Sequence, residues 1–184
     1  HNRRQLKLLW ISSEKLEEKD KETWELLHSA DGILVPGGFG IRGTEGKIMA
    51  AKYARENSVP YLGLCLGMQI MTIEFARHVL GDSKITSEEF DEGKKMPRSK
   101  YVSHFLPNQT WHTDKGGTLR LGKYPCKLQP KTKTQAAYGV KVIDERHRHR
   151  YEVNNDFRKK LEEKGWVPAG IYEKADLVEI AELR

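Results

Sequence analysis

Cysteine is scarce in this sequence, which has only Cys65 and Cys126 among its 184 residues. Small secreted domains depend on several disulfides, so this scarcity favours free thiols and a reducing, cytoplasmic setting. No apolar run approaches the roughly 18–20 residues that a transmembrane helix needs, and the basic residues 1–5 are not followed by an apolar segment of signal-peptide length. We therefore expect no membrane partner.

The sequence also lacks the patterns by which nucleic acids and metals are bound. Its formal net charge is +6, yet it has no helix-turn-helix spacing, no zinc-ligand set and no basic strand studded with aromatic residues. Lysine and arginine are interspersed with glutamate and aspartate, as in residues 14–25 and 158–164, which is typical of solvated helix faces. We expect neither a nucleic-acid partner nor a bound metal.

Apolar runs alternate with amphipathic stretches in the first 80 residues. This alternation indicates β-α-β units, a parallel sheet and helices on both of its faces. After an irregular stretch at 81–122, short strand-like runs predominate, so we expect an α/β fold with a mostly parallel sheet and a more β-rich C-terminal part. The predicted strands are residues 6–11, 32–35, 59–64, 124–128, 140–143, 151–153, 170–172 and 177–180, and the predicted helices are 19–28, 44–57, 68–79 and 156–164.

Cys65 is flanked by Gly63 and Gly67 at the end of a predicted buried strand. A nucleophile elbow has this pattern, because small neighbours let the backbone turn sharply from strand to helix and let a substrate approach. The free N–H groups at the helix start favour the thiolate, the form that attacks. A lone cysteine after a strand is more often a core residue, but the two glycines favour a nucleophile here.

A second glycine-rich turn, residues 36–40, follows the neighbouring predicted strand. The carboxyl edge of a doubly wound sheet carries ligands, and glycines there expose backbone N–H groups to a developing negative charge. The turn lacks the Lys-Ser/Thr of a P-loop and the Gly-x-Gly-x-x-Gly spacing. By itself it is a structural turn or a phosphate cradle. Beside an elbow cysteine it is better interpreted as part of an oxyanion hole.

These two turns, in this order, resemble class I glutamine amidotransferase domains. Five segments together resemble the glutaminase domain of the CTP synthase family: 37–43, 64–69, 89–90, 116–122 and 145–154. The last two of these segments are specific to that family. The resemblance extends from about residue 6 to residue 183. It implies a chain that ends before the second half of a catalytic triad and that lacks the ATP-dependent synthetase domain, so residues 1–184 are expected to be an amidotransferase domain incomplete at both ends.

The resemblance implies a role for several residues. Cys65 is the nucleophile that attacks the glutamine side-chain amide, and the backbone N–H groups of Gly38 and Leu66 form the oxyanion hole. Substrate-binding residues are Gly38, Leu66, Gln69, Glu89 and Arg148, of which Glu89 pairs the α-ammonium and Arg148 the α-carboxylate of glutamine. Arg42 matches a position linked to activation by GTP, and residues 116–122 match a lid segment.

The sequence departs from this family pattern at the catalytic base. The family completes its triad with a His-x-Glu pair, and none of the seven histidines here has a glutamate two positions on. The pair most similar to His-x-Glu is His149 with Glu152, which are three positions apart. Without a base, the cysteine depends on the helix start alone for its thiolate, so we expect these 184 residues alone to be inactive.

The resemblance implies a glutaminase that supplies ammonia for the ATP-dependent conversion of UTP to CTP in pyrimidine biosynthesis. Its implied partners are L-glutamine, a synthetase domain of the same polypeptide, GTP as an activator and further copies in a tetramer. No cofactor is expected in this chain, and ATP and Mg²⁺ belong to the synthetase domain. Two alternatives are a catalytically dead binding module and another class I cysteine hydrolase, such as a γ-glutamyl peptidase; the segments at 116–122 and 146–151 argue against the latter.

Overall fold

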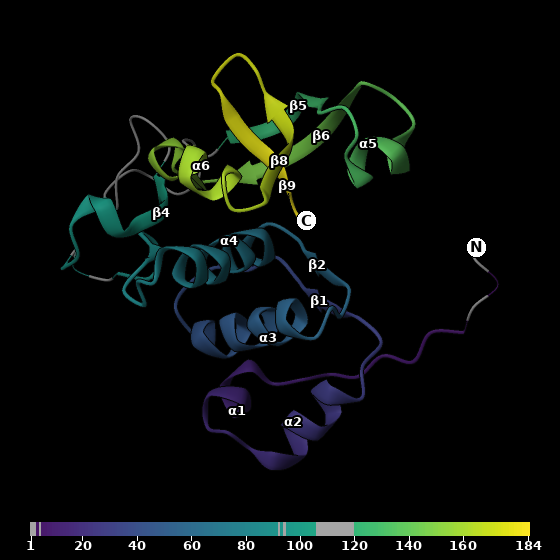
Figure 1. The fold of residues 1–184 in the computed structure, drawn as a ribbon, viewed down its shortest axis with the longest axis vertical. Coiled ribbons are helices and arrows are strands. Elements are labelled where there is room, and N and C mark those ends of the chain that lie inside the picture. The colour runs from purple at the N-terminus through teal and green to yellow at the C-terminus, as the bar shows by residue number, and fades with distance from the viewer. Residues whose placement is uncertain (1–2, 4, 92, 94, 106–119) are drawn as a thin grey trace. The chain divides into compact units, whose positions relative to one another are not determined.

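The structure is a computed structural model that describes residues 3, 5–91, 93, 95–105 and 120–184. The chain forms two compact units, His1–Met71 and Thr72–Arg184 (Figure 1). No helix in the described residues is long and apolar enough to cross a membrane.

The N-terminal unit contains a parallel pair of short strands and three helices, and a fourth helix begins in it. The two strands, β1 and β2, pair in register from Ile33↔Tyr61 to Val35↔Gly63. Parallel pairing requires a crossover, which α3 supplies. The elements are α1 (Ser13–Glu17), α2 (Lys21–His28), β1 (Ile33–Val35), α3 (Thr44–Glu56), β2 (Tyr61–Gly63) and α4 (Leu66–Leu80), the last of which ends in the second unit.

Side-chain caps and a small core fix the first two helices. Asp20 caps α2, where its carboxylate accepts from Thr23 N–H at 2.9 Å, and this removes one of the unpaired donors of a helix start. Leu16, Leu27 and Ala50 form a buried cluster that joins α1, α2 and α3. Helix α1 was not predicted as a separate element, because the short polar stretch 14–25 reads as one continuous solvated face.

The predicted strand at residues 6–11 is wrong. These residues have no regular secondary structure, and Leu6, Leu8 and Trp10 are 79%, 66% and 89% exposed. A strand is stabilised by the hydrogen bonds of a neighbouring strand, and none of the described strands pairs with this segment. The predicted strand at 32–35 is present as β1, in which Val35 is buried but Leu34 is 57% exposed. The expected burial of the strand before Cys65 is wrong, because Leu62 is 54% exposed and Leu64 is 47% exposed.

The C-terminal unit is built mainly from two sheets, with strand orders β3-β4-β7 and β6-β5-β8-β9. Pairing is parallel between β3 and β4 and antiparallel elsewhere in these sheets. The α/β class and the β-rich C-terminal part are confirmed. The elements are β3 (Thr86–Ser87), the 3₁₀ turn η1 (Arg98–Lys100), β4 (Tyr101–Phe105), β5 (Arg120–Leu128), α5 (Lys133–Tyr138), β6 (Val142–His149), β7 (Tyr151–Val153), α6 (Asn155–Glu162), β8 (Trp166–Tyr172) and β9 (Leu177–Leu183).

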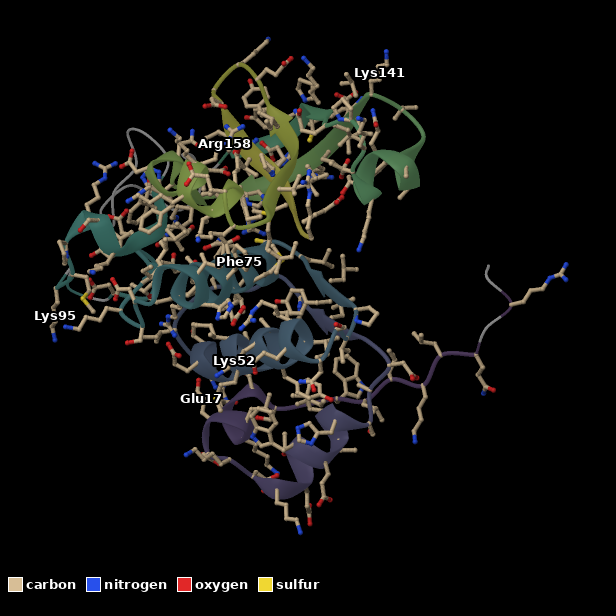
Figure 2. All side chains as sticks on the ribbon, in the orientation of Figure 1. Glu17, Lys52, Phe75, Lys95, Lys141 and Arg158 are labelled. Carbon is tan, nitrogen blue, oxygen red and sulfur yellow. The ribbon has the colours of Figure 1, made fainter. Side chains whose placement is uncertain are left out.

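Two features of this unit differ from the sequence prediction. Strands β3 and β4 lie in the stretch 81–122, which was expected to be irregular, and helix α5 lies between two predicted strands, where no element was predicted. Strand β6 is longer than predicted and runs to His149, because its last residues, although charged, pair with β5 from Arg120↔His149 to Lys127↔Val142. Hydrophobic periodicity cannot reveal a strand whose inward positions are polar. Helix α6 is fixed on its outer face by Arg158, labelled in Figure 2, which donates to Glu162 and Asp176 at 2.7 and 2.8 Å.

Candidate functional site

Cys65 stands in the two-residue turn between β2 and α4. Its φ is 53°, a left-handed conformation that non-glycine residues rarely adopt, and its side chain is partly exposed. Leu64 N–H donates to Val35 O at 3.0 Å, and Gly67 N–H donates to Leu64 O at 2.9 Å. The predicted strand-to-helix turn, with its strained backbone at the cysteine, is therefore confirmed.

Glycines allow main-chain atoms to surround Cys65 closely. A Cβ on Gly67 would lie 2.2 Å from Val35 O, and a Cβ on Gly63 would lie 2.4 Å from the carbonyl carbon of Gly67. No real side chain fits at such distances, so the elbow requires glycine at both positions. A Cβ on Gly37 would lie 3.3 Å from Cys65 Cβ and 4.0 Å from its Sγ. The second glycine-rich turn therefore lies against the thiol.

The predicted oxyanion-hole and glutamine-binding residues of this unit lie beside the same turn. Leu66 is the first residue of α4, where N–H groups have no acceptor within the helix. A Cβ on Gly38 would lie 3.3 Å from Leu66 Cδ2. Gln69 follows one helical turn later, is 6% exposed, and its N–H lies 3.4 Å from Cys65 O. The structure brings these four residues together, and their roles in binding stay predictions.

Arg42, the predicted regulatory residue, lies on the surface of the same unit. Its side chain is 85% exposed and donates through Nε to a carboxylate oxygen of Glu14 in α1. This hydrogen bond raises the pKa of Arg42 and lowers the pKa of Glu14. Arg42 O accepts from Lys47 Nζ at 2.7 Å. An exposed guanidinium held by one ion pair can exchange that partner for an anionic ligand.

Cys126 differs from Cys65 in its exposure. Neither cysteine forms a disulfide, but Cys65 is partly exposed, whereas Cys126 is completely buried on β5. Burial and, after it, the charge of Glu179 raise the pKa of the Cys126 thiol to about 12. A buried thiol with a raised pKa is inert, so Cys65 is the candidate nucleophile. In the described residues, no group of three or more His, Cys, Asp or Glu side chains is placed to hold a metal ion.

Glu89 lies in the C-terminal unit, in the turn that follows β3. It is 6% exposed, and its N–H lies 3.2 Å from Ser87 Oγ. The adjacent Glu88 fastens this turn to β4: Glu88 N–H donates to Ser103 O at 2.8 Å, and Glu88 Oε2 accepts from Phe105 N–H at 2.9 Å. The predicted ligand for an ammonium group is therefore a buried carboxylate on a turn held by hydrogen bonds.

Arg148 lies on β6 opposite Leu121 of β5, and both side chains are exposed. Because side chains alternate along a strand, its neighbours His147 and His149 lie on the opposite face of the sheet. His147 is 6% exposed. Arg148 thus has the exposure that a carboxylate-binding guanidinium requires, while the histidines beside it belong to the interior.

Four ionisable side chains meet on that interior face. We call Arg120, His147, Glu152 and Glu179 the buried ion network; their side chains are 7%, 6%, 5% and 3% exposed. Arg120 Nη2 lies 2.8 Å from Glu152 Oε1, and Arg120 Nη1 lies 2.7 Å from Glu179 Oε1. His147 Nε2 contacts Glu179 Oε2. The network joins β5, β6, β7 and β9.

The pKa values in and beside the network are strongly shifted. Burial raises the pKa of Glu152 to about 7, although the Arg120 charge opposes this shift. Burial would also raise the pKa of Glu179, but hydrogen bonds from His147 and Arg120 outweigh it and hold this pKa below its usual value. For His149, burial and the neighbouring His147 and Arg120 lower the pKa to about 4, so its ring is neutral at pH 7.

Sequence reasoning missed this network. Arg120 appeared only as part of the predicted lid segment, and Glu179 only as part of a strand. Residues 116–119 of that segment lie outside the described residues, and Arg120, Leu121 and Gly122 belong to β5. Glu152 was paired with His149 in the sequence, but in the structure its carboxylate accepts from Arg120. One signal was available: charged residues within predicted strands need buried partners.

The fold and the elbow define an amidotransferase domain. The profile of the family described as "Glutamine amidotransferase class-I" matches residues 1–184, and the chain belongs to this family.

Within it, the chain is similar to CTP synthases. It is 57% identical over 176 residues to the CTP synthase of Roseiflexus sp. (strain RS-1), which is 95% of this chain and 30% of that protein. It is 51% identical over 179 residues to the CTP synthase of Bacillus subtilis (strain 168), which is 97% of this chain and 32% of that protein.

A solved structure supports the same relationship. The glutaminase domain of the Trypanosoma brucei CTP synthase, with acivicin bound, matches 98% of this chain and 67% of that chain, with a TM-score of 0.82 and 33% sequence identity. The chain spans about a third of the length of the curated relatives it matches.

Proposed function

We propose that this chain is the glutaminase domain of a CTP synthase and hydrolyses L-glutamine to supply ammonia for the ATP-dependent conversion of UTP to CTP. One observation carries the proposal. Cys65 is a partly exposed thiol at a strained strand-to-helix turn, against the glycine-rich turn at Gly37. The similarity to CTP synthases supports the choice of glutamine as substrate and of the synthetase domain as the partner.

The proposed chemistry begins with the Cys65 thiolate. Its sulfur attacks the side-chain amide carbon of glutamine, and the C–N bond breaks as the nitrogen takes up a proton and leaves as ammonia. The N–H groups of Gly38 and Leu66 stabilise the oxyanion that forms on the way, and one such donor is worth about 3–4 kcal/mol. Water then hydrolyses the thioester, which releases glutamate and restores the thiol.

Three side chains would provide the proposed contacts to glutamine. Gln69 lies on α4, Glu89 lies in the turn after β3, and Arg148 lies on β6. A buried carboxylate at Glu89 suits the α-ammonium of glutamine, and the forked guanidinium of Arg148 suits the α-carboxylate. Each charged group of the amino acid would therefore be recognised by a side chain of opposite charge.

The proposal extends to the rest of the polypeptide. ATP and Mg²⁺ would be bound by a synthetase domain, GTP would activate glutamine hydrolysis through Arg42, and the enzyme would work as a homo-oligomer in the cytoplasm. The exposed guanidinium of Arg42 is compatible with recognition of a nucleotide phosphate.

Replacement of Cys65 by alanine in the full-length polypeptide tests the proposal. We expect Cys65→Ala to abolish CTP formation from glutamine and to leave CTP formation from free ammonia unchanged, because only the ammonia source is lost. CTP formation is followed with each nitrogen donor in turn. Equal loss of both activities would show that the cysteine does not serve glutamine hydrolysis. A wild-type protein that binds glutamine without releasing ammonia would instead indicate a catalytically dead module.

A further inference from the structure

The hydrogen-bond partners of His147 indicate that its imidazole ring carries a second proton within the buried ion network. His147 Nδ1 lies 2.9 Å from the backbone carbonyl oxygen of Glu145, which can only accept a hydrogen bond. His147 Nε2 contacts a carboxylate oxygen of Glu179. Since both ring nitrogens face acceptors, a proton must lie on each, and the one at Nε2 is shared between His147 and Glu179.

Charge balance explains why this proton stays. Arg120 alone faces two carboxylates, Glu152 and Glu179. Burial raises the pKa of Glu152 to about 7, so above about pH 7 both carboxylates are ionised and the three groups carry a net charge of −1. The proton shared by His147 and Glu179 then brings the network to neutrality, which a buried cluster requires. Tyr124 and Tyr172, over whose rings the Arg120 guanidinium lies, and His149, whose ring centroid is 5.1 Å from that of His147, also surround it. The buried Cys126 thiol lies near it as well, and burial followed by the charge of Glu179 raises the pKa of this thiol.

The network includes residues of strands that are linked to both predicted ligands of the amino-acid group of glutamine. At one end, His147 directly precedes Arg148 on β6 and points inward where Arg148 points outward. At the other end, Glu152 on β7 pairs with His104 of β4, the strand to which the turn carrying Glu89 is fastened.

A second contact reaches the same turn from β7. Tyr151 stacks on Phe105 with ring centroids 4.6 Å apart. Burial and, after it, the negative charge of Glu89 raise the pKa of the Tyr151 phenol. The strand that carries Glu152 therefore also contacts the surroundings of Glu89.

We propose that the buried ion network positions Arg148 and Glu89 for glutamine, and that the proton shared by His147 and Glu179 keeps the network closed. The four network residues are positioning residues and do not touch the substrate. This inference rests on the proposed glutaminase function. Loss of the proton leaves an uncompensated buried charge that pushes β6 and β9 apart, so Arg148 is displaced and the affinity for glutamine falls while the chemistry at Cys65 persists.

Two replacements of His147 in the full-length polypeptide test the role of charge. His147→Gln removes the second proton, and His147→Lys keeps a positive charge without the ring. We expect the KM for glutamine to rise about tenfold in His147→Gln with a much smaller change in kcat, and to return toward the wild-type value in His147→Lys. If the side chain matters only for packing, the two variants will be equally impaired, and the proposal is wrong.

The isosteric change Glu179→Gln keeps the charge balanced but removes the carboxylate that pairs with Arg120 and His147. Strand β9 then loses its charged contacts to β5 and β6, and we expect KM to rise. Glu173→Gln is the matched control, because Glu173 forms an exposed ion pair with Lys127 just beyond β8, and it should leave KM unchanged. An unchanged KM in Glu179→Gln overturns the proposal, and this variant decides the question if the His147 variants do not fold.

Labelling of Cys65 by iodoacetamide separates mispositioning from misfolding. This reagent has neither an α-ammonium nor an α-carboxylate, so Arg148 and Glu89 do not hold it. Variants with a raised KM should be labelled at the wild-type rate. If a variant loses both glutamine affinity and the rate of Cys65 labelling, it has a general structural defect, and a positioning role is contradicted. The glutaminase function is judged separately by wild-type turnover and its loss in Cys65→Ala. Turnover with an unaltered KM in every network variant would refute this inference alone.

Discussion

Main-chain atoms surround Cys65 in the N-terminal unit, whereas ionised side chains fasten the strand of Arg148 in the C-terminal unit. Around the cysteine, close contacts of Gly63 and Gly67 leave no space for a side chain. Around the strands of the second unit, Arg120 contacts Glu152 and Glu179, and Glu179 also contacts His147, so four buried ionisable side chains hold one another. The first arrangement is sensitive to volume, and the second is sensitive to charge and pH.

The largest effect on stability is expected where a buried cation is removed. Arg120→Met keeps an unbranched side chain but leaves the buried Glu152 carboxylate without its counter-charge and leaves Glu179 with only the proton that it shares with His147. We expect the free energy of unfolding at pH 7 to fall by about 3–5 kcal/mol, measured by urea denaturation. The control is Lys127→Met, which breaks an exposed pair with Glu173 on the same sheet. Similar small losses in both variants would mean that the network contributes no more than a surface ion pair.

A volume change should have the next largest effect, in the other unit. In Gly67→Ala the added Cβ would lie 2.2 Å from Val35 O, so β1 or α4 must shift. Overpacking costs typically about 1–3 kcal/mol, and we expect the upper end together with loss of Cys65 reactivity toward iodoacetamide. Gly32→Ala is the matched control, because its Cβ would lie 3.5 Å from Pro60 O, an ordinary contact. A Gly67→Ala variant of wild-type stability would contradict the tight elbow.

The same comparison explains what the sequence could predict. The elbow was predictable because its residues are consecutive: a strand, two glycines around Cys65, and a helix. The network was not predictable, because Arg120, His147, Glu152 and Glu179 are separated by up to 59 positions and meet only when four strands pair. Strand β6 was truncated in the prediction for the same reason, since its inward residues are polar. The resemblance to a family supplied Glu89 and Arg148, which physical reasoning alone would assign to the surface.

At residues 6–11 the sequence pattern predicts a strand that the structure does not contain. Their apolar pattern favours a strand, but a strand also needs a hydrogen-bonding neighbour, and local sequence carries no information on whether one is present. Leu6, Leu8 and Trp10 are accordingly exposed, while Ile11 packs on the cluster of Leu16 and its neighbours. Local pattern therefore predicts helices and turns better than it predicts strand pairing.

The pH dependence of stability tests the charge sensitivity of the second unit. The pKa of Glu152 is about 7 in the folded protein, against a usual value of 4.5. The unfolded chain therefore loses this proton first, and the group lowers stability as pH rises from about 4.5 to 7. His149 has a folded pKa of about 4 against a usual 6.5, so it lowers stability as pH falls from 6.5 to 4. The two effects oppose each other, and the wild-type stability should be nearly flat between pH 4.5 and 6.5.

Single replacements should reveal each contribution. In Glu152→Gln, stability should rise with pH between 4 and 6.5, because only the His149 effect remains. In His149→Gln, stability should fall with pH between 4.5 and 7. We expect a change of about 1–2 kcal/mol across each window, given about 1.4 kcal/mol per pKa unit and partial relaxation of the site. Urea denaturation at half-unit pH steps measures it, and identical profiles in the two variants would contradict the assigned shifts.

The smallest effect on stability is expected at Arg42. Its ion pair with Glu14 lies on the surface, where water screens the attraction and two long side chains must be ordered to form it. We therefore expect Arg42→Ala to leave the unfolding midpoint unchanged within error, in contrast to Arg120→Met.

If GTP acts through Arg42, the same variant in the full-length polypeptide should lose activation of glutamine hydrolysis by GTP while its rate without GTP is preserved. Glu14→Gln is the control, because it frees the Arg42 guanidinium instead of removing it and should keep the activation. A clear destabilisation in Arg42→Ala, or full activation by GTP, would show that the exposed pair has a structural role and that the nucleotide is recognised elsewhere.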